Sequence, residues 1–181
     1  MLSERNLKHD SEQLERPGRA RPPVYDMNPI AEILNIDAVE ANLSAANKKA
    51  LFQHLSSAAA RLTGLPAKQI LTVLNEREKI GSTGFGAGTA IPHGKIEGLP
   101  AVFGYLARLS TPVDFHSVDG LPVDLVFLLL SPPDAGAQHL KALAGISRTL
   151  RDRQIVAKLR GARSKDALYA LVVGEEARNA A

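Results

Sequence analysis

Apolar and polar positions divide the chain into a polar first segment, a patterned middle and a short polar end. Residues 1–26 carry five basic and five acidic side chains, three prolines and few aliphatic side chains. Such a segment buries too little apolar surface to offset the entropy of ordering it. We therefore expect a flexible N-terminal extension over 1–26, one domain over 27–174 and a frayed tail over 175–181. A further hypothesis is that Met27 is the natural start.

Apolar residues at helical spacing predict six helices, most of them preceded by a capping side chain or a proline. The expected helices cover about 28–34, 44–62, 66–80, 135–150, 152–160 and 164–173. The expected caps of the first, second, fifth and sixth helices are Asn28, Ser44, Asp152 and Ser164. Gly64 is expected to end the second helix, because glycine adopts the left-handed conformation that closes helices.

Two nearly continuous apolar runs, residues 102–109 and 123–130, have the pattern of strands that are covered on both faces. Shorter strands are expected at about 38–43 and 89–91. Because strands and helices alternate along the chain, we predict an α/β sandwich with helices on both faces of the sheet.

Composition excludes several classes of function. The chain has 181 residues, a net charge of +3, 4% aromatic residues and no cysteine. The mild charge and scarce aromatics argue against nucleic-acid binding. The absence of cysteine excludes thiolate and iron–sulfur chemistry and fits a cytoplasmic protein. No apolar run reaches the roughly 18 residues of a membrane span, and no metal-binding motif occurs. We expect no membrane insertion, metal or cofactor.

Four glycines fall within the eight residues from Gly81 to Gly88, GSTGFGAG. The segment lacks the Lys-Ser/Thr pair of a nucleoside-triphosphate loop, and its spacing fits neither the dinucleotide fingerprint nor an esterase elbow. Successive amides in such a loop can form a nest for an anion, for which Ser82, Thr83 and Gly84 are candidates. The alternative is a tight connection between a helix and a strand.

His93 follows this segment, between Pro92 and Gly94. Pro92 restricts the backbone before the histidine, and Gly94 removes side-chain bulk after it, so that a bulky group could approach. If a backbone carbonyl binds one ring N–H, the other nitrogen is a free, uncharged nucleophile. That arrangement suits in-line attack on a phosphoryl group. The alternative is a histidine merely ordered in a turn.

Two further side chains are candidates for supporting such a group. His139 begins a helix and shares a face with apolar residues, so it is either a boundary histidine with one satisfied nitrogen or a donor to a phosphoryl oxygen. Arg77 lies in a charged helix end, four residues before Gly81. Its guanidinium is either solvated or able to reach an anion in the glycine segment.

The block from Arg77 to Lys95, REKIGSTGFGAGTAIPHGK, resembles the active-site signature of the fructose–mannitol–nitrogen-regulatory class of IIA proteins. These proteins belong to the bacterial phosphoenolpyruvate-dependent phosphotransferase system. The resemblance covers about residues 27–173, and the nitrogen-regulatory branch fits best. Phe85 and Ala87 depart from it, because an aliphatic residue and an asparagine are more usual there.

The resemblance implies a mixed β-sheet with helices on both sides. It also implies that His93 accepts a phosphoryl group from the phosphocarrier protein HPr or its nitrogen-branch relative, forming a covalent phosphohistidine, and that His139 and Arg77 support that group. The implied function is a phosphotransferase-relay regulator of nitrogen or potassium balance, whose regulated partners the sequence does not name.

Two alternatives stay open beside the regulatory protein. One is a sugar-specific IIA component of the fructose or mannitol type, which passes phosphate to a separate permease subunit through the same His93 chemistry. The other is a binding module that has the fold without transfer. The presence of Arg77, His93 and His139 together argues against that module, since binding alone has no physical need of all three.

Overall fold

The computed structural model describes residues 28–174, so the expectations for 1–26, for Met27 and for 175–181 lie outside the described residues. Eleven helices and strands follow one another in this part of the chain. They are β1 (Leu34–Leu43), α1 (Lys48–Thr63), α2 (Ala67–Ile80), β2 (Gly84–Gly86), β3 (Thr89–Ala90), β4 (His93–Lys95), β5 (Phe103–Val113), β6 (Val123–Ser131), α3 (Gly136–Arg151), α4 (Arg153–Gly161) and α5 (Lys165–Gly174).

The strands form a mixed sheet in the order β1-β5-β6-β3-β2. The central pair β5 and β6 is antiparallel, whereas β1 runs parallel to β5. On its other side β6 pairs in parallel first with β3 and then, further along, with β4. Since β4 begins at His93, this pairing attaches the histidine to the centre of the sheet.

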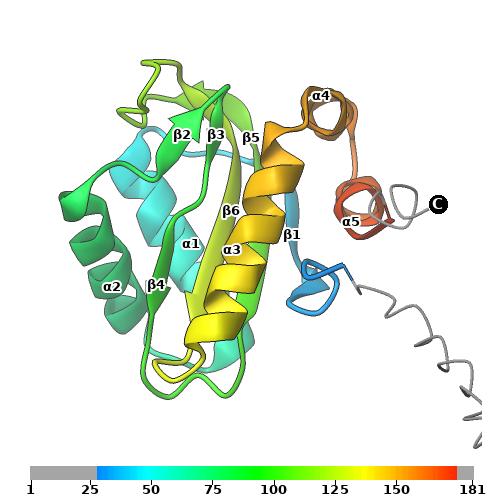
Figure 1. The fold of residues 1–181 in the computed structure, drawn as a ribbon. Helices are drawn as coiled ribbons and strands as arrows, with labels where there is room; N and C mark the ends of the chain where they lie inside the picture. Colours follow the sequence, from blue (N-terminus) through cyan, green and yellow to red (C-terminus); the bar gives the residue numbers. More distant parts are fainter. Residues whose placement is uncertain (1–27, 175–181) are drawn as a thin grey trace, which may run out of the picture.

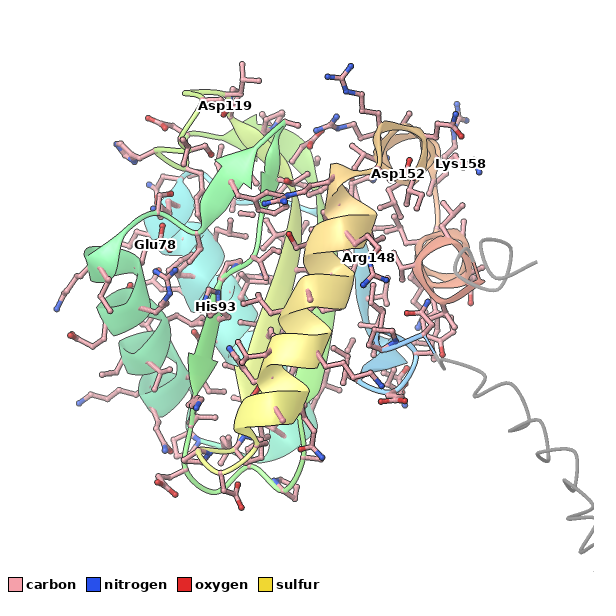
Figure 2. The ribbon with its side chains drawn as sticks, viewed as in Figure 1. Glu78, His93, Asp119, Arg148, Asp152 and Lys158 are labelled. Carbon is pink, nitrogen blue, oxygen red and sulfur yellow. The ribbon has the colours of Figure 1, made fainter. Side chains whose placement is uncertain are left out.

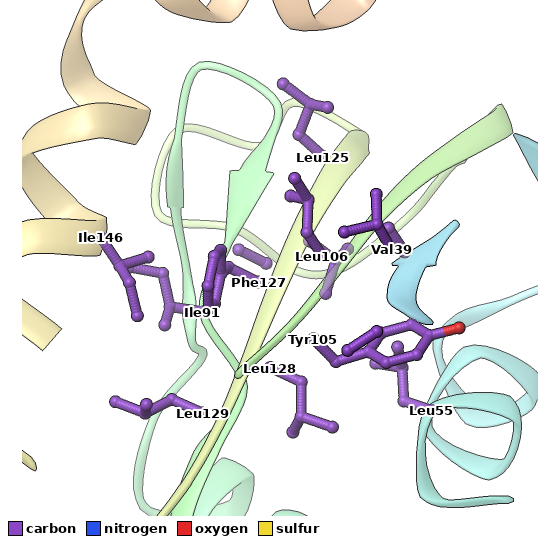
Figure 3. Packing of buried hydrophobic residues seen from close by; sticks show 14 of the residues in the cluster. Val39, Leu55, Ile91, Tyr105, Leu106, Leu125, Phe127, Leu128, Leu129 and Ile146 are labelled. Carbon is purple, nitrogen blue, oxygen red and sulfur yellow. The ribbon is translucent and has the colours of Figure 1, made fainter. Parts of the chain in front are cut away.

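Helices cover both faces of the sheet, with α1 and α2 on one side and α3 on the other, and α4 and α5 continue from α3 towards β1 (Figure 1). The apolar side chains of β6 are each at most 1% exposed. Figure 3 shows Leu55 of α1 and Ile146 of α3 on opposite sides of these strands. The predicted α/β architecture, and the interpretation of the long apolar runs as doubly covered strands, are confirmed.

Most predicted helices form, with one change of cap. Gly64 ends α1 with a φ of 76°, and the Asp152 side chain accepts hydrogen bonds from two amides at the start of α4, as expected. The predicted cap Ser44 is wrong, because Asn47 is the residue that caps α1. Its Oδ1 accepts from the N–H of Ala50 at 2.9 Å, which satisfies an amide that has no partner within the helix.

The helix predicted over 28–34 is wrong. Hydrogen-bonded turns occupy 29–33, and β1 already begins at Leu34 rather than near residue 38. Asn28 does accept from the N–H of Ile30 at 2.9 Å, as a cap would. However, the N–H of Gly104 in β5 donates to the carbonyl of Ile33 at 2.9 Å. Sheet pairing therefore outweighs a helical pattern only one or two turns long.

The glycine segment, predicted as a loop, contains strand β2 and forms an antiparallel hairpin with β3. The two residues at its tip, Ala87 and Gly88, have φ values of 54° and 75°, the signs that a type I′ turn requires. Arg160 of α4 binds the hairpin from outside. Its Nη2 donates to the carbonyl of Ala87 at 2.7 Å and to Asp124 at 2.8 Å.

Candidate functional site

His93 is the first residue of β4, and both of its ring nitrogens have a partner. Nδ1 lies 2.7 Å from the carbonyl oxygen of Ile91. Because a carbonyl can only accept, Nδ1 carries the proton and Nε2 has a free lone pair. The condition set from the sequence, a carbonyl that binds one ring N–H, is therefore met. Figure 2 shows His93 on β4, in the space between α2 and α3.

The partner of the free nitrogen is Arg77, in the last turn of α2. Its Nε donates to Nε2 of His93 at 3.1 Å, and its Nη1 donates to the carbonyl of Gly81 at 2.9 Å. One guanidinium therefore joins the histidine to the start of the glycine segment. The interpretation of Arg77 as a merely solvated helix end is wrong.

Gly94 has a different role from the one expected. A Cβ at this position would collide with Cγ1 of Val73, which belongs to α2. The missing side chain therefore lets α2 lie directly against β4, rather than clearing space beside the imidazole for an incoming group. This close approach brings Arg77 within hydrogen-bond distance of His93.

His139 lies in the first turn of α3, and its ring is 5.7 Å from that of His93, centroid to centroid, at an interplanar angle of 50°. The residue is 8% exposed. A hydrogen bond of 2.7 Å joins its Nδ1 to Oγ of Ser131, the last residue of β6. Ser131 pairs with Lys95 of β4, so both histidines are held by the paired strands β4 and β6.

Both imidazoles favour their neutral form. Burial has the largest effect on the pKa of His93 and lowers it. The hydrogen bond to the Ile91 carbonyl, next in size, raises this pKa, the charge of Arg77 lowers it, and the charge of Glu78 raises it, so that the net change is downward. Burial also lowers the pKa of His139, with a contribution from His93 and Lys95. Both rings are therefore mostly uncharged at neutral pH, and the permanent positive charge beside His93 belongs to Arg77.

The backbone amides proposed for an anion nest are largely engaged within the protein. The N–H of Thr83 donates to both carboxylate oxygens of Glu78, at 3.0 and 3.1 Å. The N–H of Gly84 donates to Oγ of Ser82 at 3.2 Å. Two of the three candidate amides thus have partners other than an anion, and the anion-binding role of Ser82, Thr83 and Gly84 stays a prediction.

Three polar residues beside the site were not identified from the sequence. Ser131 binds His139. Glu78, the residue after Arg77, forms an ion pair of 2.5 Å with Lys48. Only Ser131 could have been recognised from the sequence, since it is a hydroxyl residue at the end of an otherwise apolar predicted strand. Lys48 and Glu78 are thirty residues apart in the sequence and look like ordinary solvated charges, because nothing local shows that the fold partly buries both side chains.

The geometry brings together an uncharged nucleophilic nitrogen, a fixed cation and a second neutral imidazole. In the part of the chain that the structure describes, no group of three or more histidine, aspartate or glutamate side chains is arranged to bind a metal ion. Nor does any helix between residues 28 and 174 have the length and apolar character to cross a membrane. The free lone pair on Nε2 and the guanidinium beside it suit nucleophilic chemistry at His93.

Comparison with known proteins places this arrangement in a family. Residues 32–174 match the family described as phosphoenolpyruvate-dependent sugar phosphotransferase system, EIIA 2. A nitrogen regulatory protein of Bradyrhizobium diazoefficiens is 49% identical over 144 residues, which are 80% of this chain and 94% of that protein. A nitrogen regulatory protein of Escherichia coli is 38% identical over 149 residues, 81% of this chain and 91% of that protein.

Among solved structures, the nitrogen regulatory protein IIA-Ntr of Neisseria meningitidis superimposes with a TM-score of 0.76 at 34% identity. The match covers 79% of this chain and 98% of that one. The chain is thus similar to nitrogen regulatory proteins over almost their full length. It belongs to the EIIA 2 family of the phosphoenolpyruvate-dependent sugar phosphotransferase system.

Proposed function

We propose that Nε2 of His93 accepts a phosphoryl group from the phosphohistidine of a small carrier protein of the HPr type. The observation that carries this proposal is the hydrogen bond between Nδ1 of His93 and the carbonyl of Ile91, which leaves the lone pair on Nε2. The lowered pKa of His93 keeps this lone pair unprotonated at neutral pH. An unprotonated nitrogen is the form that attacks phosphorus.

The transfer is an exchange of one nitrogen–phosphorus bond for another. The Nε2 lone pair attacks phosphorus in line with the bond to the donor's ring nitrogen. That bond breaks, and its electron pair returns to the donor imidazole. The product on this chain is a phosphoimidazolium, whose ring carries one positive charge and keeps its proton on Nδ1, where the Ile91 carbonyl binds it. Such a reaction depends mainly on alignment and on stabilising charge on the phosphoryl oxygens.

Arg77 and His139 supply that stabilisation. When phosphorus occupies the Nε2 lone pair, the guanidinium loses its bond to this nitrogen, and its N–H groups can bind phosphoryl oxygens instead. His139, whose Nδ1 is bound to Ser131, can direct its other nitrogen to a further oxygen. The dianionic group thus gains a permanent cation and a neutral donor.

The surroundings of the site suit a protein partner. Ile80 follows Arg77 by one turn of α2 and is 84% exposed, and Leu140 follows His139 and is 66% exposed. Large exposed apolar side chains at a site are typical of surfaces that bind other proteins. They favour transfer from a macromolecular donor over transfer from a small phosphate ester.

The biological role that we infer is regulation of nitrogen metabolism by the phosphorylation state, in the cytoplasm. The relatives from Bradyrhizobium diazoefficiens and Escherichia coli are both named nitrogen regulatory protein. A phosphoryl group adds about −1.5 to −2 charges at neutral pH, which changes the proteins that can dock on this surface. The alternative is a sugar-specific component of the fructose or mannitol type, which would pass its phosphoryl group on to a permease subunit.

The proposal is tested with phosphoenolpyruvate, the general phosphotransferase enzyme and its HPr-type carrier. Intact-mass measurement should detect one acid-labile phosphoryl group on the wild type and none on His93→Ala. His116→Ala is the matched control, because this histidine is highly exposed and lies outside the site; it should label like the wild type. Equal labelling of His93→Ala would contradict the assignment. Onward transfer from the phosphoprotein to a fructose- or mannitol-type IIB subunit would favour the sugar alternative.

A further inference from the structure

Glu78 follows Arg77 in the sequence, but the two side chains have separate partners. The Glu78 side chain is 11% exposed, and its carboxylate accepts hydrogen bonds from Thr83. The shortest comes from Oγ1 of Thr83, at 2.6 Å, and the N–H of Thr83 donates to both carboxylate oxygens. The carboxylate therefore closes the turn of residues 81–83 back onto the last turn of α2.

The charge of Glu78 is balanced by Lys48, from the first turn of α1. The two charged atoms are 2.5 Å apart, and the Lys48 side chain is 21% exposed. Nζ of Lys48 also donates to the carbonyl of Phe115 at 2.9 Å and lies 4.3 Å from the centre of the Phe115 ring. The Phe115 residue is fully buried. Lys48 thus fixes the carboxylate against the core, while Arg77 keeps its own charge for His93.

The closed turn contains the second anchor of Arg77. Nη1 of Arg77 binds the carbonyl of Gly81, two residues before Thr83, and its Nε binds His93. If Glu78 released Thr83, the turn would keep only weaker restraints, the bond from the N–H of Gly81 to the Glu78 carbonyl and that from Ser82 to the Phe115 carbonyl, both of 3.2 Å. The Gly81 carbonyl, and with it the guanidinium, would then be less firmly positioned. A carboxylate without Lys48 would also compete with His93 for the neighbouring guanidinium.

A second ion pair on the same turn of α2 is an ordinary exposed surface pair. Glu76 and Lys79 are 2.6 Å apart, but their side chains are 64% and 70% exposed. Such a pair contributes little to stability. It provides a matched control for Glu78, two residues away on the same helix.

We propose that the Lys48–Glu78 pair is a positioning device for the phosphoryl site, which aims the Arg77 guanidinium at Nε2 of His93 by closing the turn of residues 81–83. This inference rests on the proposed function for its kinetic consequence. Neither Lys48 nor Glu78 contacts the reacting nitrogen. The role of the pair is to fix the direction of Arg77 before the phosphoryl group arrives, which matters because phosphoryl transfer is sensitive to alignment.

The test compares Glu78→Gln with Glu76→Gln. In the first variant the amide cannot pair with Lys48 or accept from Thr83 at both of its atoms. At saturating HPr-type carrier we expect the phosphorylation rate of Glu78→Gln to fall about ten- to a hundredfold, with little change in KM for the carrier. Glu76→Gln should match the wild type. Lys48→Arg, which keeps the charge, should retain more of the rate than Lys48→Met.

A second readout needs no phosphotransfer. The Nε–H signal of Arg77 in nitrogen-15 NMR should move or broaden in Glu78→Gln and Lys48→Met, but not in Glu76→Gln. If Glu78→Gln matches Glu76→Gln in both rate and signal, the positioning proposal is overturned. If the wild type takes no phosphoryl group, the proposed function fails, whereas the Arg77 signal still decides the positioning proposal. Should Glu78→Gln not fold, Lys48→Met, altered at the more exposed partner, decides by the same two readouts.

Discussion

Both ring nitrogens of His93 are hydrogen-bonded, one to an acceptor and the other to a donor. The carbonyl of Ile91 requires a proton on Nδ1 of His93, and the N–H of Arg77 requires a lone pair on Nε2. Protonation of Nε2 would break the second bond and place two positive charges side by side. The Ile91 bond therefore fixes which nitrogen carries the proton, whereas burial and the charge of Arg77 keep the ring neutral.

Removing the Arg77 charge should raise the pKa of His93. We expect Arg77→Gln to move this pKa upward, because the guanidinium favours the neutral ring. The measurement is a pH titration of the His93 ring signals by NMR in wild type and variant. Lys79→Gln is the control on the same helix turn, since Lys79 pairs with Glu76 and not with the site. A pKa that stays the same or falls in Arg77→Gln would show that the contact is absent in solution.

The hydrogen bond of His93 to a backbone carbonyl could be predicted from the sequence, but the other residues around the ring could not. Pro92 and Gly94 marked His93 as unusual, and the need for a carbonyl on one nitrogen could be stated in advance. The bond to Arg77 could not be predicted from local spacing, because it depends on how closely α2 approaches β4. Ser131 and Glu78 were missed for the same reason, since burial of polar groups is decided by tertiary packing.

Among the contacts between secondary-structure elements, the one between α2 and β4 determines how the residues of the site lie relative to one another. Gly94 of β4 lies under Val73 of α2, with no room for a side chain between them. The helix carries Arg77 and the strand carries His93, so the separation of the two elements sets the distance between the guanidinium and the imidazole.

Gly94→Ala should therefore disturb both stability and the site. We expect a loss of about 1–3 kcal/mol in the free energy of unfolding, because the new methyl group overpacks the contact. Urea denaturation measures this loss, and the phosphorylation rate should fall as Arg77 moves away. The double variant Gly94→Ala/Val73→Ala, which removes the colliding methyl groups, should recover part of both. A fully stable and active single variant would show that the two elements are not in close contact.

The turn of the β2–β3 hairpin can be tested by substitution at Ala87. Ala87 has a φ of 54°, and Gly88 follows with 75°, which is a turn that favours Asn-Gly. Ala87→Asn should raise the free energy of unfolding by about 0.5–1 kcal/mol, whereas Ala87→Val should lower it. The bonds from Ala87 to Asp119 and Arg160 use only its backbone, so both variants keep them. Equal midpoints of urea denaturation for both variants would contradict the left-handed turn.

Elements with strong patterns were predicted well, and short ones were not. Local residue properties determine the strands β5 and β6, the end of α1 at Gly64 and the start of α4 at Asp152, so that these features could be predicted from the sequence. The first predicted helix failed because the chain at 28–34 had only one or two turns of apolar pattern, and pairing with β5 offered more hydrogen bonds. Strand β2 was missed because its three residues, two of them glycines, carry almost no strand signal.

In the whole molecule, helices from opposite faces of the sheet meet around one surface that carries the site. Helix α2 lies on one side, α3 lies on the other, and the end of β6 with β4 between them carries Ser131 and His93 (Figures 1 and 2). The sandwich architecture could be predicted from alternation alone. The surface on which its two sides meet could not, since it depends on the order of strands in the sheet.

The two histidines should make the stability of the fold depend on pH. Folding lowers the pKa of both His93 and His139, so the unfolded chain binds more protons at mildly acid pH. Stability should be greatest above the ordinary histidine pKa and should fall as pH decreases through the lowered values. Urea midpoints between pH 7.5 and 5 measure this loss. His139→Gln should show a smaller loss than the wild type, and an equal or larger loss would contradict the burial of a neutral His139.

The phosphoryl acceptor that we propose is Nε2 of His93. The most direct measurement is phosphorus–nitrogen correlation NMR on the nitrogen-15-labelled protein, after phosphorylation through the HPr-type carrier at neutral pH. Phosphorus should couple to Nε2 of His93, while Nδ1 of the same ring keeps its proton. Coupling to Nδ1 of His93, or to either nitrogen of His139, would contradict the account.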